Sequence, residues 1–519
     1  MALTKIPSEL SSTTGIVDNS NATAITIDSN ENVAFSGNIS TSTAGTSNFI
    51  AGVNAGNSIA SGSTYNVLLG DEAGTAITTG DANVAIGFSA LATEDAHGFN
   101  TAVGHETLKV LNAGADAYNT AVGFRAGLAV TTGVRNTLIG GASGDSLTTG
   151  SYNVALGYDS LAVDTLGAKA VALGYGALST QNFTSATDNY NVAVGFAAGN
   201  AITTGIRNTI MGGQAGDALT DADDNVAIGA LALSGDTLGS QSVAIGRGAL
   251  KVQNFTSATS TYNVAVGYSA GESTTTGTHN TFIGGLAADA NTTGYYNVAV
   301  GASALGANTT GISNTAVGYN AGYSITTGPK NTLVGHIAGD VITTGANNVM
   351  VGSGANVASG GHDNCIVLGQ NVTCTGSGNF TFGFSTVDSN IAAGATTITA
   401  PSDERYKEEI ETSTAGLSFI NDLRPVTFKW KKEKDIPDTQ KAYVEGSEER
   451  VMNDYTNHGF IAQEVKAVID AHDEIKDGFD MWMEDAADGR QRLGPSALIP
   501  VLVKAIQELT TRIEELEGN

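Results

Sequence analysis

The sequence predicts a mainly β protein: a long parallel β-solenoid shaft followed by a small α+β domain that ends in a coiled-coil helix. A short apolar strand ending in glycine recurs every 17 residues through most of the chain. Charge then changes abruptly, since the last 118 residues hold 41 charged residues and the first 401 hold 34. We expect an N-terminal segment at 1–45, a shaft at 46–385, a linker at 386–401 and a compact domain at 402–519.

The repeat is defined by a glycine that follows a strand such as NVAIG or NTAVG. The spacing is 17 residues for most steps, and a shorter step ends the series. The repeat glycines are Gly52, Gly70, Gly87, Gly104, Gly123, Gly140, Gly157, Gly174, Gly195, Gly212, Gly229, Gly246, Gly267, Gly284, Gly301, Gly318, Gly335, Gly352, Gly369 and Gly383.

The residue types of the repeat suit one rung of a parallel β-coil. Val, Ile, Leu and Thr favour strands, glycine permits the positive φ of a tight corner, and Asn tolerates left-handed backbone and caps it by hydrogen bonds. Stacked at ~4.8 Å, about 20 rungs predict a rod of roughly 90 to 100 Å. Asn residues aligned from rung to rung would form a ladder of side-chain amides. We therefore expect these residues to be structural.

Two rungs are longer than the rest, with 21 residues from Gly174 to Gly195 and from Gly246 to Gly267. Both insertions contain the string QNFTSAT, which indicates a duplicated block. Insertions on a regular rod fall on its surface. Phe183 and Phe255 are therefore candidate receptor contacts. In the alternative, each phenylalanine folds back onto the rod.

Composition excludes several classes of function. The net charge of −27 argues against binding nucleic acid through phosphates. Cys365 and Cys374 are too few for a disulfide-stapled scaffold, and either two free thiols or one local bridge fits the sequence. No apolar run suits a membrane span and the first residues lack a secretory core, so we expect synthesis in a cytosol and no membrane insertion. The scattered histidines predict no metal site, and no motif predicts a cofactor.

The NVAVG and NTAVG rungs resemble the head repeats of trimeric autotransporter adhesins, and similar rungs occur in phage tail fibres. The resemblance covers roughly residues 48 to 385, with a period longer than is usual in that family. It implies a homotrimer. A thin coil of mainly Ala, Val and Gly also buries little apolar surface by itself, which favours association.

The charged region resembles the intramolecular chaperone domain that closes phage endosialidases, tail spikes and some tail fibres. Three stretches carry the resemblance, SDERYKEEIETSTAGLSFINDLRPVTFKWK, HGFIAQEV and SALIPVLVKAIQELTTRIEELEGN. It implies that Ser402 is a nucleophile, Lys407 its base and Pro401–Ser402 the bond that is cut. The lysine would have to be partly neutral, which burial in an assembled interface can supply. The spacing suits this pair, because a helix starting near Asp403 would return Lys407 toward its first turn. Without the resemblance, Ser402 reads as the cap of that helix and Lys407 as a solvated side chain.

The last helix carries apolar residues at spacings of three and four, the pattern of a coiled-coil seam: Ile499, Leu502, Ile506, Leu509, Ile513 and Leu516. Ile and Leu at these positions favour two strands, whereas both resembled families are trimeric, and we expect three on that ground. A helix packed on its own domain is the alternative.

These observations predict a homotrimeric phage tail fibre or spike, assembled in the host cytoplasm and then part of the virion. It would attach to tail or baseplate proteins through its N-terminal segment and bind a glycan or protein receptor on the host. Its chaperone domain would hold three chains in register and then cut itself off, a single-turnover Ser-Lys reaction. A tailspike glycan depolymerase and a bacterial trimeric surface adhesin are the alternatives.

Overall fold

The chain divides into two compact units, Met1–Pro401 and Ser402–Asn519. The computed structural model describes residues 25–27, 33–35, 44–385, 387–395, 398, 402, 404–440, 442–475, 479–484 and 489–518. Much of the predicted N-terminal segment lies outside these residues. Within it, β1 (Ile25–Ile27) and β2 (Val33–Phe35) form an antiparallel pair.

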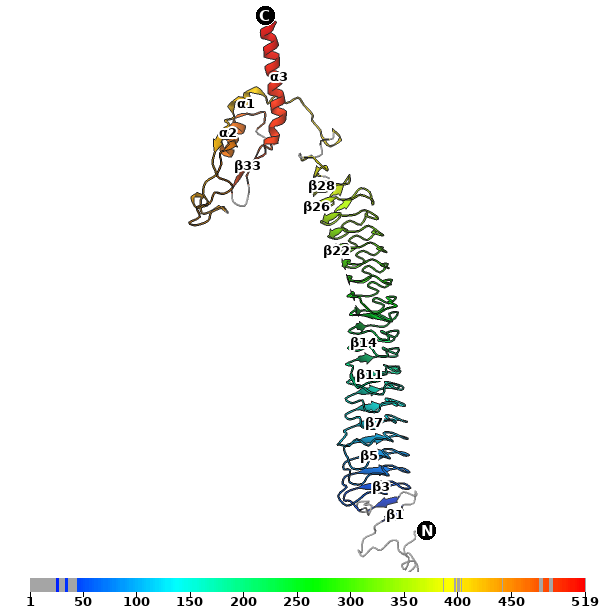
Figure 1. The fold of residues 1–519 in the computed structure, drawn as a ribbon. Coiled ribbons are helices and arrows are strands. Elements are labelled where there is room, and N and C mark those ends of the chain that lie inside the picture. The colour runs from blue at the N-terminus through cyan, green and yellow to red at the C-terminus, as the bar shows by residue number, and fades with distance from the viewer. Residues whose placement is uncertain are drawn as a thin grey trace, which may run out of the picture. The chain divides into compact units, whose positions relative to one another are not determined.

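The first unit contains a parallel β-solenoid in which most rungs add one three-residue strand to a continuous ladder, as predicted (Figure 1). The strands are β3 (Phe49–Ala51), β4 (Val67–Leu69), β5 (Val84–Ile86), β6 (Thr101–Val103), β7 (Thr120–Val122), β8 (Thr137–Ile139), β9 (Val154–Leu156), β11 (Val171–Leu173), β13 (Val192–Val194), β14 (Thr209–Met211), β15 (Val226–Ile228), β17 (Val243–Ile245), β19 (Val264–Val266), β20 (Thr281–Ile283), β21 (Val298–Val300), β22 (Thr315–Val317), β23 (Thr332–Val334) and β24 (Val349–Val351).

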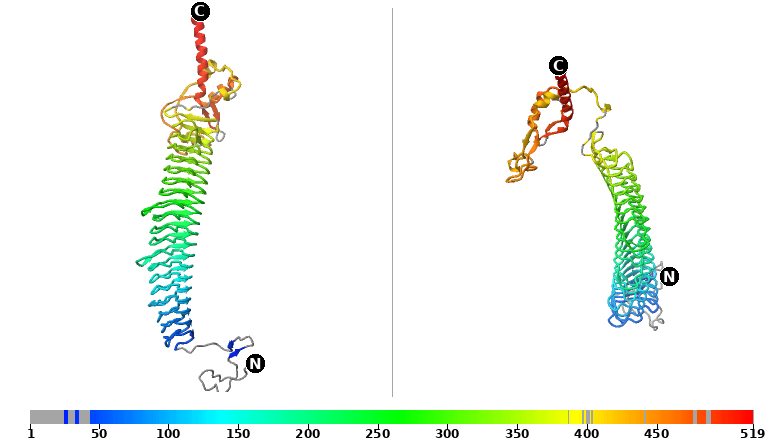
Figure 2. Two further views of the ribbon diagram at one scale, coloured as in Figure 1. Left: turned by 90° about the vertical axis from the view of Figure 1, so that its right-hand side faces the viewer. Right: turned by 45° about the horizontal axis from the view of Figure 1, so that its top comes forward.

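The ladder ends with β26 (Ile366–Gln370), β28 (Phe380–Phe384) and the antiparallel β29 (Val387–Ile391). Short second pairs join β10 (Gly167–Ala168) to β12 (Thr187–Asp188), β16 (Gly239–Ser240) to β18 (Thr259–Ser260), and β25 (Asn356–Val357) to β27 (Thr373–Cys374). The first two of these pairs flank the insertions, which project from the column in the side view (Figure 2).

Strict register gives the rod its core. From β4 to β24, the middle residue of each ladder strand points inward and is fully buried, as Ala155 and Ala172 are, and it pairs with its equivalent in the next rung. The first and third residues face outward. Because the inward positions are mostly alanine and leucine, the coil is thin and closely packed.

The rung glycines are required by a close approach between rungs. Gly157 has φ +142°, and a Cβ built there would lie 2.4 Å from the carbonyl oxygen of Gly174 in the next rung. A side chain would therefore meet backbone while its own residue adopted a strained conformation.

The predicted asparagine ladder is present, with its hydrogen bonds directed mainly to backbone. The N–H of Asn153 donates to Oδ1 of Asn136 at 2.9 Å, and Nδ2 of Asn153 donates to the carbonyl of Gly167 at 3.0 Å. The ladder asparagines do not have left-handed backbone. The residue before them does, as in Tyr152 with φ +62°, so that part of the prediction is wrong.

In the described part of the second unit there are three α-helices, α1 (Leu417–Asp422), α2 (Ala462–Ala471) and α3 (Leu498–Glu517). Its strands pair as β30 (Val426–Phe428) with β31 (Asn457–Gly459) and β32 (Trp482–Glu484) with β33 (Gln491–Leu493). Single 3₁₀ turns are η1 (Glu404–Tyr406), η2 (Glu433–Asp435) and η3 (Pro495–Ala497). A small core surrounds Phe419, Met481 and Val501, which agrees with the predicted small α+β domain.

Candidate functional site

Ser402 and Lys407 lie side by side at the start of the second unit. Nζ of Lys407 donates to Oγ of Ser402 at 2.8 Å, and both residues are exposed. The intervening turn explains the approach, because η1 folds the backbone so that the N–H of Lys407 donates to the carbonyl of Glu404 at 3.0 Å. An amine within hydrogen-bond distance of a hydroxyl is the geometry that a nucleophile and its base require.

The local structure differs from the expected helix. The chain forms one 3₁₀ turn rather than an α-helix, and Lys407 follows the last residue of that turn. A 3₁₀ turn is tighter than an α-turn, which returns the chain within three residues. Pro401, on the other side of the predicted scissile bond, lies outside the described residues, as does Asp403.

Helix α3 has two apolar faces with different surroundings. Leu498, Val501 and Ala505 are buried against the second unit. The predicted seam is not packed on this unit, since its six side chains are 41% to 77% exposed: Ile499, Leu502, Ile506, Leu509, Ile513 and Leu516. The helix therefore offers an uncovered apolar stripe at heptad spacing.

The rod has a second uncovered apolar surface, which we call the outer sheet face and define as the first and third side chains of the ladder strands. Several are substantially exposed, including Leu156 at 45% and Ile366 at 42%. An aromatic row follows the rung glycines, in which Tyr158 stacks on Tyr175 and Tyr175 on Phe196 at centroid distances of 5.8 and 5.3 Å. An exposed apolar surface that continues over many rungs is typical of a surface that associates with another protein chain.

The insertions do not present their phenylalanines to solvent. Phe183 is 5% exposed and Phe255 is 7% exposed, so both rings fold back onto the rod. The alternative considered for these rings is therefore what the structure shows, and the expectation of exposed receptor contacts is wrong for the rings. The cause is local: the N–H of Phe183 donates to Oδ1 of Asp164 at 3.3 Å, which draws the insertion inward.

The insertions also repair a break in the asparagine ladder that sequence reasoning missed. Ala170 occupies a ladder position and offers no side-chain oxygen to the next rung. Instead, Oδ1 of Asn189 accepts the N–H of Asn191 at 2.9 Å, and Oε1 of Gln181 accepts from Nδ2 of Asn191 at 2.8 Å. Nε2 of the same Gln181 side chain donates to Oδ2 of the buried Asp164 at 2.6 Å.

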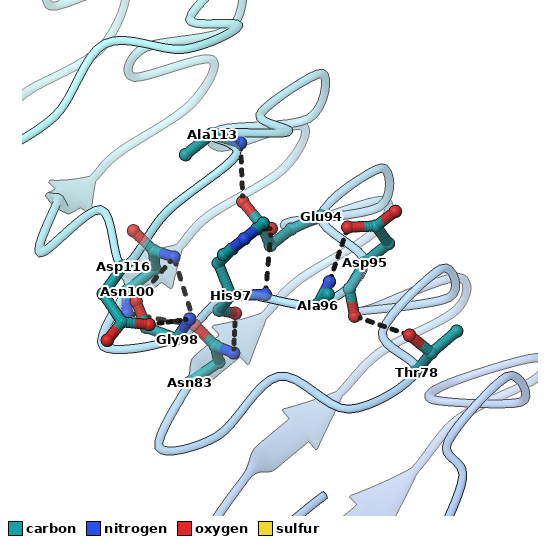
Figure 3. Close-up of polar contacts among 10 residues, drawn as sticks. All are labelled: Thr78, Asn83, Glu94, Asp95, Ala96, His97, Gly98, Asn100, Ala113 and Asp116. Carbon is teal, nitrogen blue, oxygen red and sulfur yellow. Dashed lines mark hydrogen bonds and ion pairs between the residues drawn. The ribbon is translucent and has the colours of Figure 1, made fainter.

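One group of acidic and histidine side chains has spacing suited to a metal, Glu94, Asp95 and His97 (Figure 3). Glu94 is fully buried, and burial raises the pKa of its carboxyl. Its Oε1 accepts from the N–H of His97 at 3.3 Å and its Oε2 from the N–H of Ala113 at 3.3 Å. These two oxygens accept hydrogen bonds from the turn at His97 and from Ala113 in the next rung. We therefore assign Glu94 a structural role.

Comparison with known proteins gives a match that covers residues 402–474 of the second unit. No curated protein and no solved structure matches the chain. Among the described residues, no helix is both long enough and apolar enough to cross a bilayer. Residues 402–474 match the family model described as chaperone of endosialidase, a match that begins at Ser402 and, together with the long β-solenoid, fits an endosialidase-type tail fibre.

Proposed function

We propose that this chain is the subunit of a homotrimeric phage tail fibre or spike whose C-terminal unit aligns three chains and then cleaves itself off between Pro401 and Ser402. The observation that carries the proposal is the 2.8 Å contact between Nζ of Lys407 and Oγ of Ser402, at the first residue of the chaperone-of-endosialidase match. The rod would then be the part that binds the host receptor.

Two uncovered surfaces support the trimer. The seam of α3 is apolar, and the outer sheet face is mostly apolar, with threonine at some first positions such as Thr137. Both surfaces repeat along their length with a fixed period. A second copy of the chain carries the same period and can therefore cover each surface in register. Near-identical rungs also allow slippage by one step, so a separate unit that sets the register has a clear purpose.

The cleavage chemistry follows from the dyad. Oγ of Ser402 adds to the carbonyl carbon of Pro401, a neutral Lys407 takes the hydroxyl proton, and that proton passes to the nitrogen of Ser402 as the peptide bond breaks. Water then hydrolyses the ester, leaving a carboxylate on Pro401 and a free amine on Ser402. Lys407 is exposed in the single chain, and a lysine becomes a base when burial disfavours its charged form. Assembly that buries the dyad would therefore switch the reaction on.

Intact mass measurement of the assembled protein tests this function. The wild type should give a shaft ending at Pro401 and a fragment beginning at Ser402, while Ser402→Ala stays intact at 52.5 kDa. Lys407→Arg should also stay intact, because arginine keeps its charge and cannot act as a base. Lys431→Ala, which removes an exposed lysine from the same unit, serves as the matched control and should cleave normally. An intact wild-type trimer, or cleavage of Ser402→Ala, would contradict the proposal.

A further inference from the structure

The short last rung of the solenoid, which leads from β26 to β28, contains both cysteines of the chain. Cys365 directly precedes β26, and Cys374 ends β27. Their Sγ atoms lie 2.8 Å apart across the interior of the coil, and both residues are fully buried. A disulfide bond is about 2.05 Å long, so only a small closure separates these sulfurs from a bond.

Cys365 occupies a position of the asparagine ladder. Its backbone N–H donates to Oδ1 of Asn348 at 2.9 Å, as a ladder asparagine would. In place of an amide that reaches the next rung, its sulfur accepts from Cys374, and both thiols lie near the carbonyl of Gly376, at 3.4 and 3.1 Å. The pair therefore stands where the hydrogen-bonded ladder ends.

We propose that Cys365 and Cys374 are a site of disulfide formation, and that the bond staples the short last rung of the rod once the protein meets a small-molecule disulfide. The bond would enclose β26 and β27 and tie the two walls of the coil together. A crosslink restricts the open states of the segment that it closes. The end of the rod would thereby resist fraying, which in a solenoid otherwise starts at terminal rungs.

The reaction balances with oxidised glutathione as the oxidant. One cysteine thiolate attacks a sulfur of glutathione disulfide and releases one glutathione, and the second thiolate then attacks the mixed disulfide and releases the other. Two protons leave the thiols and two electrons pass to glutathione. Burial, with Cys374 adjacent, raises the pKa of the Cys365 thiol to about 12, so the closed rung is unreactive and oxidation proceeds when the rung opens.

The experiment incubates the reduced full chain with oxidised glutathione at pH 8 and then maps its peptides without reduction. We expect the loss of two hydrogens and a crosslinked peptide pair containing Cys365 and Cys374. Hydrogen exchange of residues 366–384 should slow at least tenfold on oxidation, while that of residues 209–228, in remote rungs, stays unchanged. The double variant C365A/C374A should show no slowing in the same buffer.

Three outcomes would overturn the inference. One is a stable glutathione adduct on either cysteine, and another is a disulfide between chains. The third is a pair of thiols that remain free after denaturation of the incubated protein. A bond that forms without slowing exchange in the last rung would remove the stapling role.

Discussion

The N–H of Asn153 donates to Oδ1 of Asn136 at 2.9 Å, and Asn153 in turn accepts from the N–H of Ala170 at 2.9 Å. Through its backbone N–H and its side chain, Asn153 thus links three successive rungs. Both asparagines are buried, so water cannot reach these backbone N–H groups. The asparagine side chains supply the hydrogen bonds that the groups need.

Substitution of one ladder residue should loosen the rod locally. In Asn153→Ala, the N–H of Ala170 and the carbonyl of Gly167 lose their side-chain partner, and each buried unpaired group costs about 1–3 kcal/mol. Hydrogen exchange at Ala170 should accelerate accordingly. Asn112→Ala, at an exposed position, is the control, with an expected change within about 0.5 kcal/mol. Equal effects of the two variants would show that the ladder contributes no specific stability.

The rung glycine should not tolerate a side chain. Gly157→Ala places a Cβ 2.4 Å from backbone in the next rung and imposes positive φ on alanine, so we expect a loss of about 2–4 kcal/mol and a lower temperature of denaturation. Gly213→Ala is matched to it, because nothing lies within 4 Å of the added Cβ and its φ is not positive. A thermal melt of both variants followed by circular dichroism makes the comparison. If Gly157→Ala and Gly213→Ala denature at the same temperature, the close-approach argument is wrong.

These two residue types show how far the sequence predicts the rod. The period identified the glycines and asparagines because stacked identical rungs need the same residue at the same place. Phe183 could not be placed in this way, since whether an inserted ring folds inward depends on contacts across rungs, here the hydrogen bond from its N–H to Asp164. A signal for the buried polar pair was present, because Gln181 follows Asp164 by one period of 17 residues and Gln253 follows Asp236 by the same number.

The candidate site was predicted unevenly. Spacing alone indicated the seam of α3, because heptad geometry is local to one helix. The spacing of Ser402 and Lys407 suited a contact between them, but the prediction of that contact came from resemblance. The expected α-helix there is a single 3₁₀ turn. Five residues around such a turn are too few for a periodic signal, so only the structure shows how the two side chains meet.

The second unit should be more stable at mildly acidic pH through His472. Nδ1 of His472 bonds Oε1 of Glu474 at 2.8 Å and Nε2 bonds Oδ2 of Asp422 at 2.9 Å, and these hydrogen bonds raise the pKa of the imidazole. A raised pKa in the folded state means that the stabilisation is complete below the unfolded value of about 6.5 and is lost as pH rises through the folded value. Helical circular dichroism during melts from pH 5.5 to 8.5 measures it.

The matched variants for this histidine are His472→Gln and His458→Gln. His472→Gln should remove the dependence of the unit's stability on pH between 5.5 and 8.5, because glutamine carries no titrating proton. The second changes an exposed histidine of the same unit and should keep the dependence. If His472→Gln retains the wild-type profile, another group is responsible.

The seam of α3 should decide whether chains associate. Ile506→Asp places a charge in the middle of the exposed apolar stripe, where Ile506 is 61% exposed in the single chain. In an assembled coiled coil the carboxylate would be buried beside its copies, and burial of unpaired like charge is strongly unfavourable. We therefore expect sedimentation equilibrium to find monomers where the wild type forms trimers. Thr510→Asp adds the same charge to an exposed position outside the seam and should leave the trimer intact. Association that survives Ile506→Asp but not Thr510→Asp would place the contact on another face of the helix, and the register of three chains would then have to be set elsewhere.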